Sequence, residues 1–282
     1  MNHTVEKAKA LKQWIVYVVL AIVVLLTLAP LALLVINSFK SQSEIVANPL
    51  QLPSEITFQY LGLAAEQIHL LQALWVTALI TVVSVILLVV ISSLTAWLMV
   101  RTKSITSSVL LFMFSASMLI PFQSVMYPLL SLFEDMGLKN HAGLILMYGG
   151  FGLSLSVFLY HGFIKSVPLA LEEAAVIDGA SIFSLFFRVV FPLVKTTTVT
   201  VIILNSVWIW NDYLLPFLVI GNQTYKTLTL ELYFAKQVSG QYSTAWDLIF
   251  PAVLISIIPI VILFVFLQKY IITGVSEGAV KG

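Results

Sequence analysis

Residues 74–100 read LWVTALITVVSVILLVVISSLTAWLMV, which is 27 consecutive residues without an acidic or basic side chain. This run is the apolar body of a longer stretch between Glu66 and Arg101. A helix rises about 1.5 Å per residue and the hydrocarbon core of a bilayer is roughly 30 Å thick, so about 20 apolar residues can cross it. The run therefore predicts a transmembrane helix.

Five more stretches of the same kind lie on either side of this one. They run between Lys12 and Lys40, between Lys103 and Glu134, from His141 to about Phe163, onward from Lys195, and between Asp247 and Lys269. Each is long enough to cross a bilayer. The sequence therefore predicts an all-α membrane protein with six transmembrane helices.

Composition excludes several other classes of protein. Hydrophobic residues make up 60% of the 282 residues and charged residues 10%, whereas soluble domains average about 45–50% and roughly 25%. A soluble globular enzyme and a disordered chain are both excluded. The net charge of +1 argues against nucleic acid as a partner. With no cysteine, four histidines without ligand spacing and no catalytic cluster, neither a metal site nor a catalytic residue is predicted.

The distribution of basic residues predicts the orientation. If the amino terminus is inside, ten of the 14 Lys and Arg residues fall in inside segments and four in outside loops, which fits the cytoplasmic bias of such residues. The expected segments are a cytoplasmic tail at 1–13, an uncleaved first helix at 14–39, an extracytoplasmic loop at 40–69, a five-helix core at 70–272 and a cytoplasmic tail at 273–282. The loop is expected to contain a short surface helix near 61–72.

The inside segment 165–195 has the pattern of two short helices joined by a hinge. Pro168 suits a first helical turn, and Glu172 and Glu173 follow it where the helix dipole favours acids. Gly179 is expected to end the first helix in the left-handed conformation, Ser181 to cap the second, and Pro192 to end it. Two interpretations remain open, an amphipathic helix on the bilayer surface and a docking element for a cytoplasmic partner.

This segment also resembles a family motif. Glu173, Ala174 and Ala175, then Asp178, Gly179 and Ala180, with Pro192 thirteen residues after Gly179, resemble the EAA loop of permease subunits of bacterial ABC importers. The run from Trp210 to Pro216 and the ending from Gly274 to Gly282 look like those of carbohydrate-uptake members, the maltose-permease-like type. The resemblance implies the type I ABC importer permease fold.

The resemblance also implies a function and its partners. In this family the EAA loop docks on a cytoplasmic ATPase dimer, a role carried over to Glu173, Ala174, Ala175, Asp178, Gly179, Ala180 and Pro192. The chain contains no G-x-x-x-x-G-K-[ST], so no cofactor is expected in it, and ATP and Mg would be bound by the partner ATPase. A sugar or oligosaccharide, delivered by an extracytoplasmic solute-binding protein, would cross the bacterial cytoplasmic membrane by alternating access. A second, usually different permease would complete the pore.

Polar residues in the fifth span suggest where solute passes. Asp212 is ionisable, and intramembrane charges are costly and usually functional; with Asn205, Trp208 and Asn211 it forms a candidate solute pathway. The competing interpretations are a position at the aromatic water interface for Asp212 and helix packing for Asn205. A self-contained carrier driven by an ion gradient is the alternative function, but it would need several such ionisable groups.

The orientation predicts the outcome of reporter fusions. Fusions placed after Lys103 and after Lys195 should report the cytoplasm, and a fusion within residues 40–60 should report the outside, because basic residues are retained in the cytoplasm. Paired cytoplasmic and external reporters at each site, normalised to the amount of fusion protein, measure this. Reversed signals would contradict the orientation.

Overall fold

A computed structural model describes residues 2–221, 223–238 and 245–279, and every regular element in these ranges is a helix. The chain divides into two compact units, which are described separately. The first comprises residues 1–70 and 234–257, and the second comprises residues 71–233 and 258–282.

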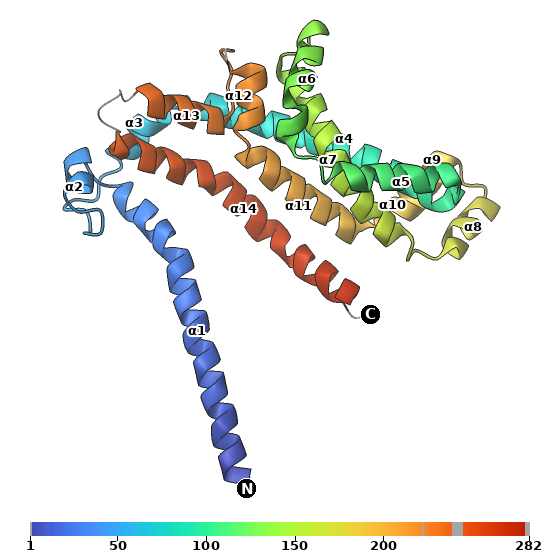
Figure 1. Cartoon of the computed structure of the whole chain (residues 1–282), viewed down its shortest axis with the longest axis horizontal. Coiled ribbons are helices and arrows are strands. Elements are labelled where there is room, and N and C mark those ends of the chain that lie inside the picture. The colour runs from blue at the N-terminus through green and yellow to red at the C-terminus, as the bar shows by residue number, and fades with distance from the viewer. Residues whose placement is uncertain (1, 222, 239–244, 280–282) are drawn as a thin grey trace. The chain divides into compact units, whose positions relative to one another are not determined.

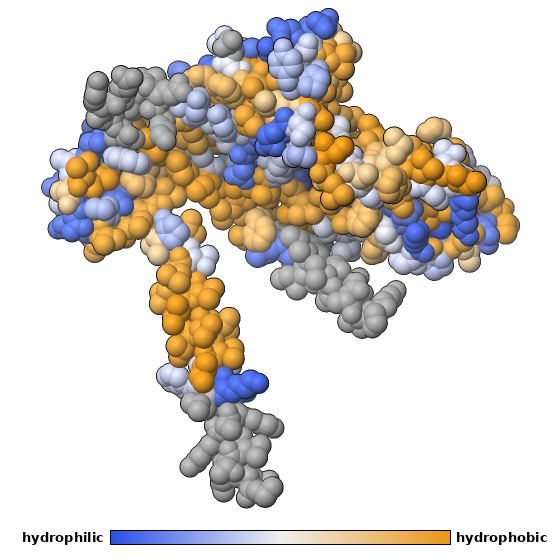
Figure 2. Space-filling view, viewed as in Figure 1, coloured by the Kyte–Doolittle hydropathy of each residue, from blue (hydrophilic) through white to orange (hydrophobic). Residues whose placement is uncertain are grey.

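The first unit contains α1 (Asn2–Asn37), α2 (Gln42–Ala47) and α3 (Gln59–Gln67), together with residues of α14 (Trp246–Ala279). Helix α1 includes a 26-residue apolar span, Lys12–Asn37. Its residues 12–32 are exposed throughout, and Figure 2 shows the apolar side chains that cover it. A long helix that is apolar and unpacked on all sides is the structure expected of a helix surrounded by lipid.

A web of hydrogen bonds orders the segment between α1 and α3. The buried Lys40 donates from Nζ to Asn37 Oδ1 at 3.3 Å and to the carbonyl oxygens of Asn48 at 3.1 Å and Pro49 at 3.3 Å. Glu44 accepts hydrogen bonds from Ser54 and Ser41, which lower the pKa of its carboxyl to about 2. This segment is therefore a defined structure rather than a loose connection.

The second unit is a helical bundle (Figure 1). Its elements are α4 (Leu70–Thr102), α5 (Ile105–Ser117), α6 (Phe122–Asp135), α7 (His141–Ile164), α8 (Leu169–Ile177), α9 (Ile182–Ser184), η1 (Leu185–Val190, a π-helical turn), α10 (Phe191–Leu193), α11 (Lys195–Asn211), α12 (Leu214–Ile220), part of α13 (Leu228–Val238) and the part of α14 from residue 258 onward. Helix α7 contacts α5, α11 and α12. Along α4, buried residues recur every three or four positions, so one face packs in the bundle while apolar residues such as Ile86 cover the other.

Small and polar residues join α4, α7 and α11. A Cβ added at Gly152 would lie 2.6 Å from Asn205 Oδ1 and 2.7 Å from Leu88 Cδ1. Asn205 donates to Ser156 Oγ at 3.1 Å, and Tyr160 donates to Thr198 Oγ1 at 2.9 Å. Lipid gives helices no hydrophobic reason to associate with one another, so close packing and interhelical hydrogen bonds hold such a bundle together.

Four of the six predicted spans are unbroken helices, at Lys12–Asn37, Leu70–Thr102, His141–Ile164 and Trp246–Phe266. The third is not the single helix that was expected. It is α5 and α6 bent by 105°, with Pro121 as the N-cap of α6. Proline disfavours the helical conformation of the residue before it, so the helix is interrupted before Pro121. The fifth is α11, which has 17 residues and meets the preceding residues 182–193 at a bend of 78°.

The bounds of one loop helix also differ from the prediction. The surface helix expected near 61–72 lies at Gln59–Gln67, and α4 begins directly after His69, whose φ of 45° interrupts the helix. Helix α14 continues to Ala279, into the predicted tail 273–282, of which 280–282 lie outside the described residues.

The packing at Gly152 predicts the effect of a small substitution. Gly152→Ala should be less stable than Gly150→Ala by about 1–3 kcal/mol, because both variants gain the helix propensity of Ala but only at Gly152 does the added methyl overpack a buried contact between α7, α4 and α11. Thermal unfolding of the purified protein in detergent measures this. The control is Gly150→Ala, where a Cβ meets nothing within 4 Å. Equal melting temperatures for both variants would refute the tight contact.

Candidate functional site

Residues 169–193, here called the elbow, form two helical arms at the end of the bundle where α4 and α7 finish (Figure 1). The first arm, α8, ends in the predicted left-handed glycine, with Gly179 at a φ of 82°. The Gly179 N–H donates to Val176 O at 3.0 Å and the Ala180 N–H to Ala175 O at 3.0 Å. These two bonds are the Schellman motif, and they fix the direction in which the chain leaves α8.

The second arm begins as predicted and ends differently. Ser181 Oγ accepts from the Ser184 N–H at 3.3 Å, which confirms the cap. Pro192 does not end the arm, because it lies within α10 and the turn comes at Val194, whose φ and ψ are −94° and 17°. The preceding η1 turn carries bonds from residue i to i−5, such as Phe191 N–H to Phe186 O. The wider turn thus lies directly before Pro192, which has no N–H to donate to the preceding turn.

One face of the elbow is exposed. Among the residues of the predicted docking motif, Glu173, Ala174, Asp178, Gly179 and Pro192 are exposed, and Ala175 and Ala180 are half-buried. Large apolar side chains at the bend are exposed beside them, with Ile177 at 85%, Ile182 at 60% and Phe183 at 73%. Figure 2 shows polar and apolar residues interleaved over α8 and α9. Such a mixture suits a protein interface better than a lipid surface.

The opposite face of α8 carries a residue whose role the sequence did not reveal. Glu172 is only 4% exposed. Its Oε1 accepts from Arg101 Nη2 at 2.6 Å and Nε at 2.9 Å, and its Oε2 accepts from Trp97 Nε1 at 3.0 Å. Arg101 also donates to the Val167 carbonyl at 3.2 Å. Because these partners are far from Glu172 in the sequence, no local pattern predicts the contact; the helix dipole explained only why an acid fits there.

The candidate pathway residues fall into two groups. Trp208 and Asp212 both contact Tyr148, whose ring lies 5.4 Å from that of Trp208 and whose hydroxyl donates to Asp212 Oδ2 at 3.0 Å. Trp208 is 40% exposed. Asn211 is also exposed and donates to its own helix, to Val207 O at 2.8 Å.

Asn205 lies apart from this group. It is 3% exposed and donates to Ser156 Oγ and to Val201 O, at 3.1 and 2.9 Å. These contacts fit the helix-packing interpretation.

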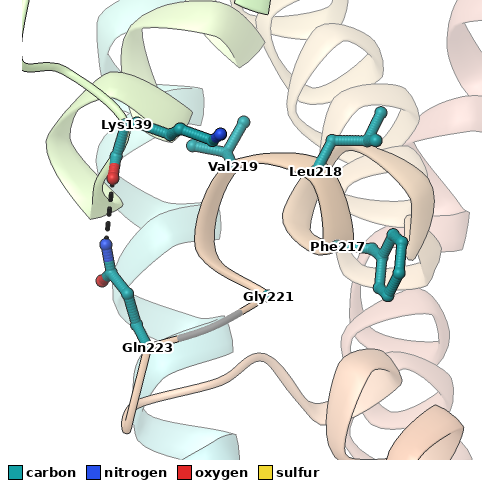
Figure 3. A pocket seen from close by; sticks show the side chains of 6 residues that line it. All are labelled: Lys139, Phe217, Leu218, Val219, Gly221 and Gln223. Carbon is teal, nitrogen blue, oxygen red and sulfur yellow. Dashed lines mark hydrogen bonds between the residues drawn. The ribbon is translucent and has the colours of Figure 1, made fainter. Parts of the chain in front are cut away.

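Figure 3 shows a pocket of about 290 Å³ near α12. It is lined by Lys139, Phe217, Leu218, Val219, Gly221 and Gln223. Gln223 Nε2 donates to Lys139 O at 3.0 Å, and Lys139 Nζ pairs with Glu134 at 3.3 Å. The pocket includes none of the predicted site residues, and these polar groups bond to the protein itself. Within the described ranges, no three His, Asp or Glu side chains gather in a way that could hold a metal ion.

A helical membrane bundle with an exposed helical elbow between two of its spans defines the class, a membrane component of a transporter. Residues 89–277 match the family described as "Binding-protein-dependent transport system inner membrane component", and the chain belongs to that family. It is a multi-pass inner-membrane protein that works with a solute-binding protein and a separate ATPase subunit.

Relatives of nearly the same length have sugar-transport names. The chain is 40% identical over 257 residues to "Probable starch degradation products transport system permease protein AmyC" of Thermoanaerobacterium thermosulfurigenes, covering 91% of this chain and 93% of that one. It is 35% identical over 270 residues to "Melibiose/raffinose/stachyose import permease protein MelC" of Bacillus subtilis, covering 95% and 96%.

The fold has a counterpart among solved structures. A chain from a bacterial ABC transporter involved in the import of the acidic polysaccharide alginate matches with a TM-score of 0.79 at 21% identity, over 90% of this chain and 94% of that chain. This match shows that the two chains share a fold.

The geometry at Gly179 predicts which substitutions the elbow tolerates. Because the chain has no cysteine, spin labels can be placed specifically on cysteines introduced at Ala174 and Phe183. Gly179→Val should broaden or shift the distance between them, since an L-residue in the left-handed region costs about 1–2 kcal/mol. Gly179→Asn should keep it, because Asn tolerates this region.

The control carries the same strain elsewhere. Gly137 also has a positive φ, 67°, and Gly137→Val should leave the label distance unchanged. Identical distances in the Gly179→Val and Gly179→Asn variants, measured by pulsed electron resonance, would contradict the prediction.

Proposed function

We propose that this chain is the permease subunit of an ABC importer that brings a sugar or oligosaccharide into the cytoplasm. The observation that carries the proposal is the elbow: most of its motif residues and its apolar bend are exposed while its other face is anchored to the bundle. Family membership supports the transporter class. The names of relatives such as AmyC and MelC support the solute class.

The elbow is the docking element for the cytoplasmic ATPase dimer. Ala174 keeps one side of α8 thin, which suits insertion of the helix into a groove. Glu173 and Asp178 supply charge for polar contacts, and Ile177 and Phe183 supply apolar area that the partner would bury. Closure of the ATPase on ATP would move the elbow, and the spans would alternate between outward-facing and inward-facing forms.

Nucleotide chemistry belongs to the partner. The chain contains no phosphate-cradling G-x-x-x-x-G-K-[ST], so ATP and Mg are bound by the ATPase subunits. A second, homologous permease completes the pathway, and a solute-binding protein delivers sugar at the opposite face. In this orientation the elbow and both termini are cytoplasmic, as the distribution of Lys and Arg indicates.

The exposed ring of Trp208 is the strongest candidate for contact with solute. Aromatic faces offer apolar area of the kind that sugar rings cover, and the neighbouring Tyr148 fixes the indole edge to face. Asp212 acts beside it by holding Tyr148. We assign Asn205 to packing of α11 on α7, and Asn211 to the exposed end of α11.

Charge reversal at the exposed acid tests the docking role. Glu173→Lys should abolish solute uptake and the co-purification of the ATPase, while membrane insertion persists, because the substitution alters only an exposed side chain. A cysteine at Ala174 should crosslink to a cysteine in the ATPase cleft, and this crosslink should disappear in the Glu173→Lys background. Uptake and crosslinking yield in cells are the measurements.

A matched control and a rival are tested in the same assay. Lys139→Glu reverses a charge far from the elbow and should keep the ATPase crosslink. Normal uptake and crosslinking by the Glu173→Lys variant would overturn the docking role. Uptake by ATP-free vesicles under an ion gradient alone would favour a secondary carrier, which the family membership argues against.

A further inference from the structure

Two adjacent acids in α8 lie in opposite environments. Glu173 is exposed, whereas Glu172 is 4% exposed and accepts three hydrogen bonds from α4. Successive helical residues are rotated by about 100°, so two neighbours can face different partners. A carboxylate buried among such donors is committed to them, since breaking one partner away leaves an unpaired buried charge. Glu172 is therefore not available to an outside protein.

The donors of Glu172 come from the last turns of α4. Trp97 and Arg101 are four residues apart, so they share one face of that helix. Arg101 bridges two points of the elbow region, since it binds the Glu172 carboxylate and also the carbonyl of Val167, two residues before α8. The start of the first arm is thereby held at two places by one guanidinium.

Trp97 connects the second arm to the same place. While its Nε1 donates to Glu172, its ring contacts that of Phe186, with centroids 5.2 Å apart. Phe186 belongs to η1 and is 1% exposed. Both arms of the elbow are therefore fastened to a single site on α4, which we call the α4 anchor, Trp97 and Arg101.

From this arrangement we propose that Glu172 is a positioning residue that, through the α4 anchor, makes the elbow and α4 move as one body. A push on the exposed face of the elbow is then delivered to the whole 33-residue helix α4. The inference rests on the proposed docking function but assigns a separate role: Glu173 binds the partner, and Glu172 passes the displacement on. Weakening the anchor should uncouple ATP hydrolysis from transport without releasing the ATPase.

The test uses the complete transporter, with its ATPase and binding protein, in proteoliposomes. The variants are Glu172→Gln, Arg101→Gln and Trp97→Phe. The last keeps the ring contact and removes only the N–H donor. The expected result is ATPase association close to wild type and a fall of about fivefold or more in solute transported per ATP hydrolysed, the lower end of typical coupling between sites. Trp97→Phe should give the smallest fall.

Matched controls separate the anchor from general effects. Lys103→Gln removes a positive charge from an exposed residue two positions after Arg101 and should leave the ratio unchanged. Arg101→Lys should recover part of the ratio lost in Arg101→Gln, because it restores the charge but not both hydrogen bonds. If the Gln variants fail to reach the membrane, the ratio of solute transported to ATP hydrolysed in the Trp97→Phe variant alone tests the proposal.

Two results would overturn the proposal. One is a wild-type ratio in Trp97→Phe together with either Gln variant or, where these are absent from the membrane, in Trp97→Phe alone. The other is loss of ATPase association in the Glu172→Gln variant to the extent seen in Glu173→Lys, which would place Glu172 in the docking surface. If Glu173→Lys itself retains the ATPase, the docking function fails, and the ratio in the anchor variants still reports on the link to α4.

Discussion

A carboxylate that leaves water must be paired, and at the end of α4 this requirement fixes the orientation of α8. Glu172 satisfies it with Arg101 and Trp97. Once that side of α8 faces α4, the helical rotation turns Glu173 and Ala174 outward, and the left-handed Gly179 then sets the course of the second arm. The exposed surface of the elbow is therefore a consequence of one buried ion pair and one glycine rather than of the exposed residues themselves.

The rest of the bundle follows a different rule, because its outer surface is apolar as well as its interior. Because lipid is as apolar as leucine, the hydrophobicity of a residue does not show whether it faces the lipid or packs against another helix. What distinguishes the packed faces is small size and hydrogen bonding, as in the contact of Gly152 with Asn205 and the pair of Tyr160 and Thr198. These contacts join α7 to α11, and α11 follows the elbow directly, so each arm of the elbow continues into a packed part of the bundle.

The parts of the structure that could be predicted from sequence are those set by local rules. Charge-free runs gave the spans, and the left-handed Gly179 and the cap at Ser181 need only their neighbours. The prolines could not be interpreted from local sequence alone. Pro121 interrupts a helix, whereas Pro128 and Pro192 lie within helices. Pro128 lies inside a regular α-helix and Pro192 follows a π-helical turn, so the presence of a proline does not by itself predict where a helix ends. The pairing of Arg101 with Glu172 joins distant segments, so no pattern in either segment contains it.

Asp212 shows that an ionisable residue in a membrane protein can have a structural role as a junction between helices. Its Oδ2 accepts from Tyr148, its Oδ1 from the Leu214 N–H at 3.1 Å, and its carbonyl from Thr229 Oγ1 at 2.7 Å. One residue thus joins α7, the end of α11, the start of α12 and α13. The cost of an acid at this depth is offset by the three connections that it makes. The neighbouring ring of Trp208 stays 40% exposed, so in this part of the protein the acid holds the helices together while the aromatic residue keeps an exposed surface.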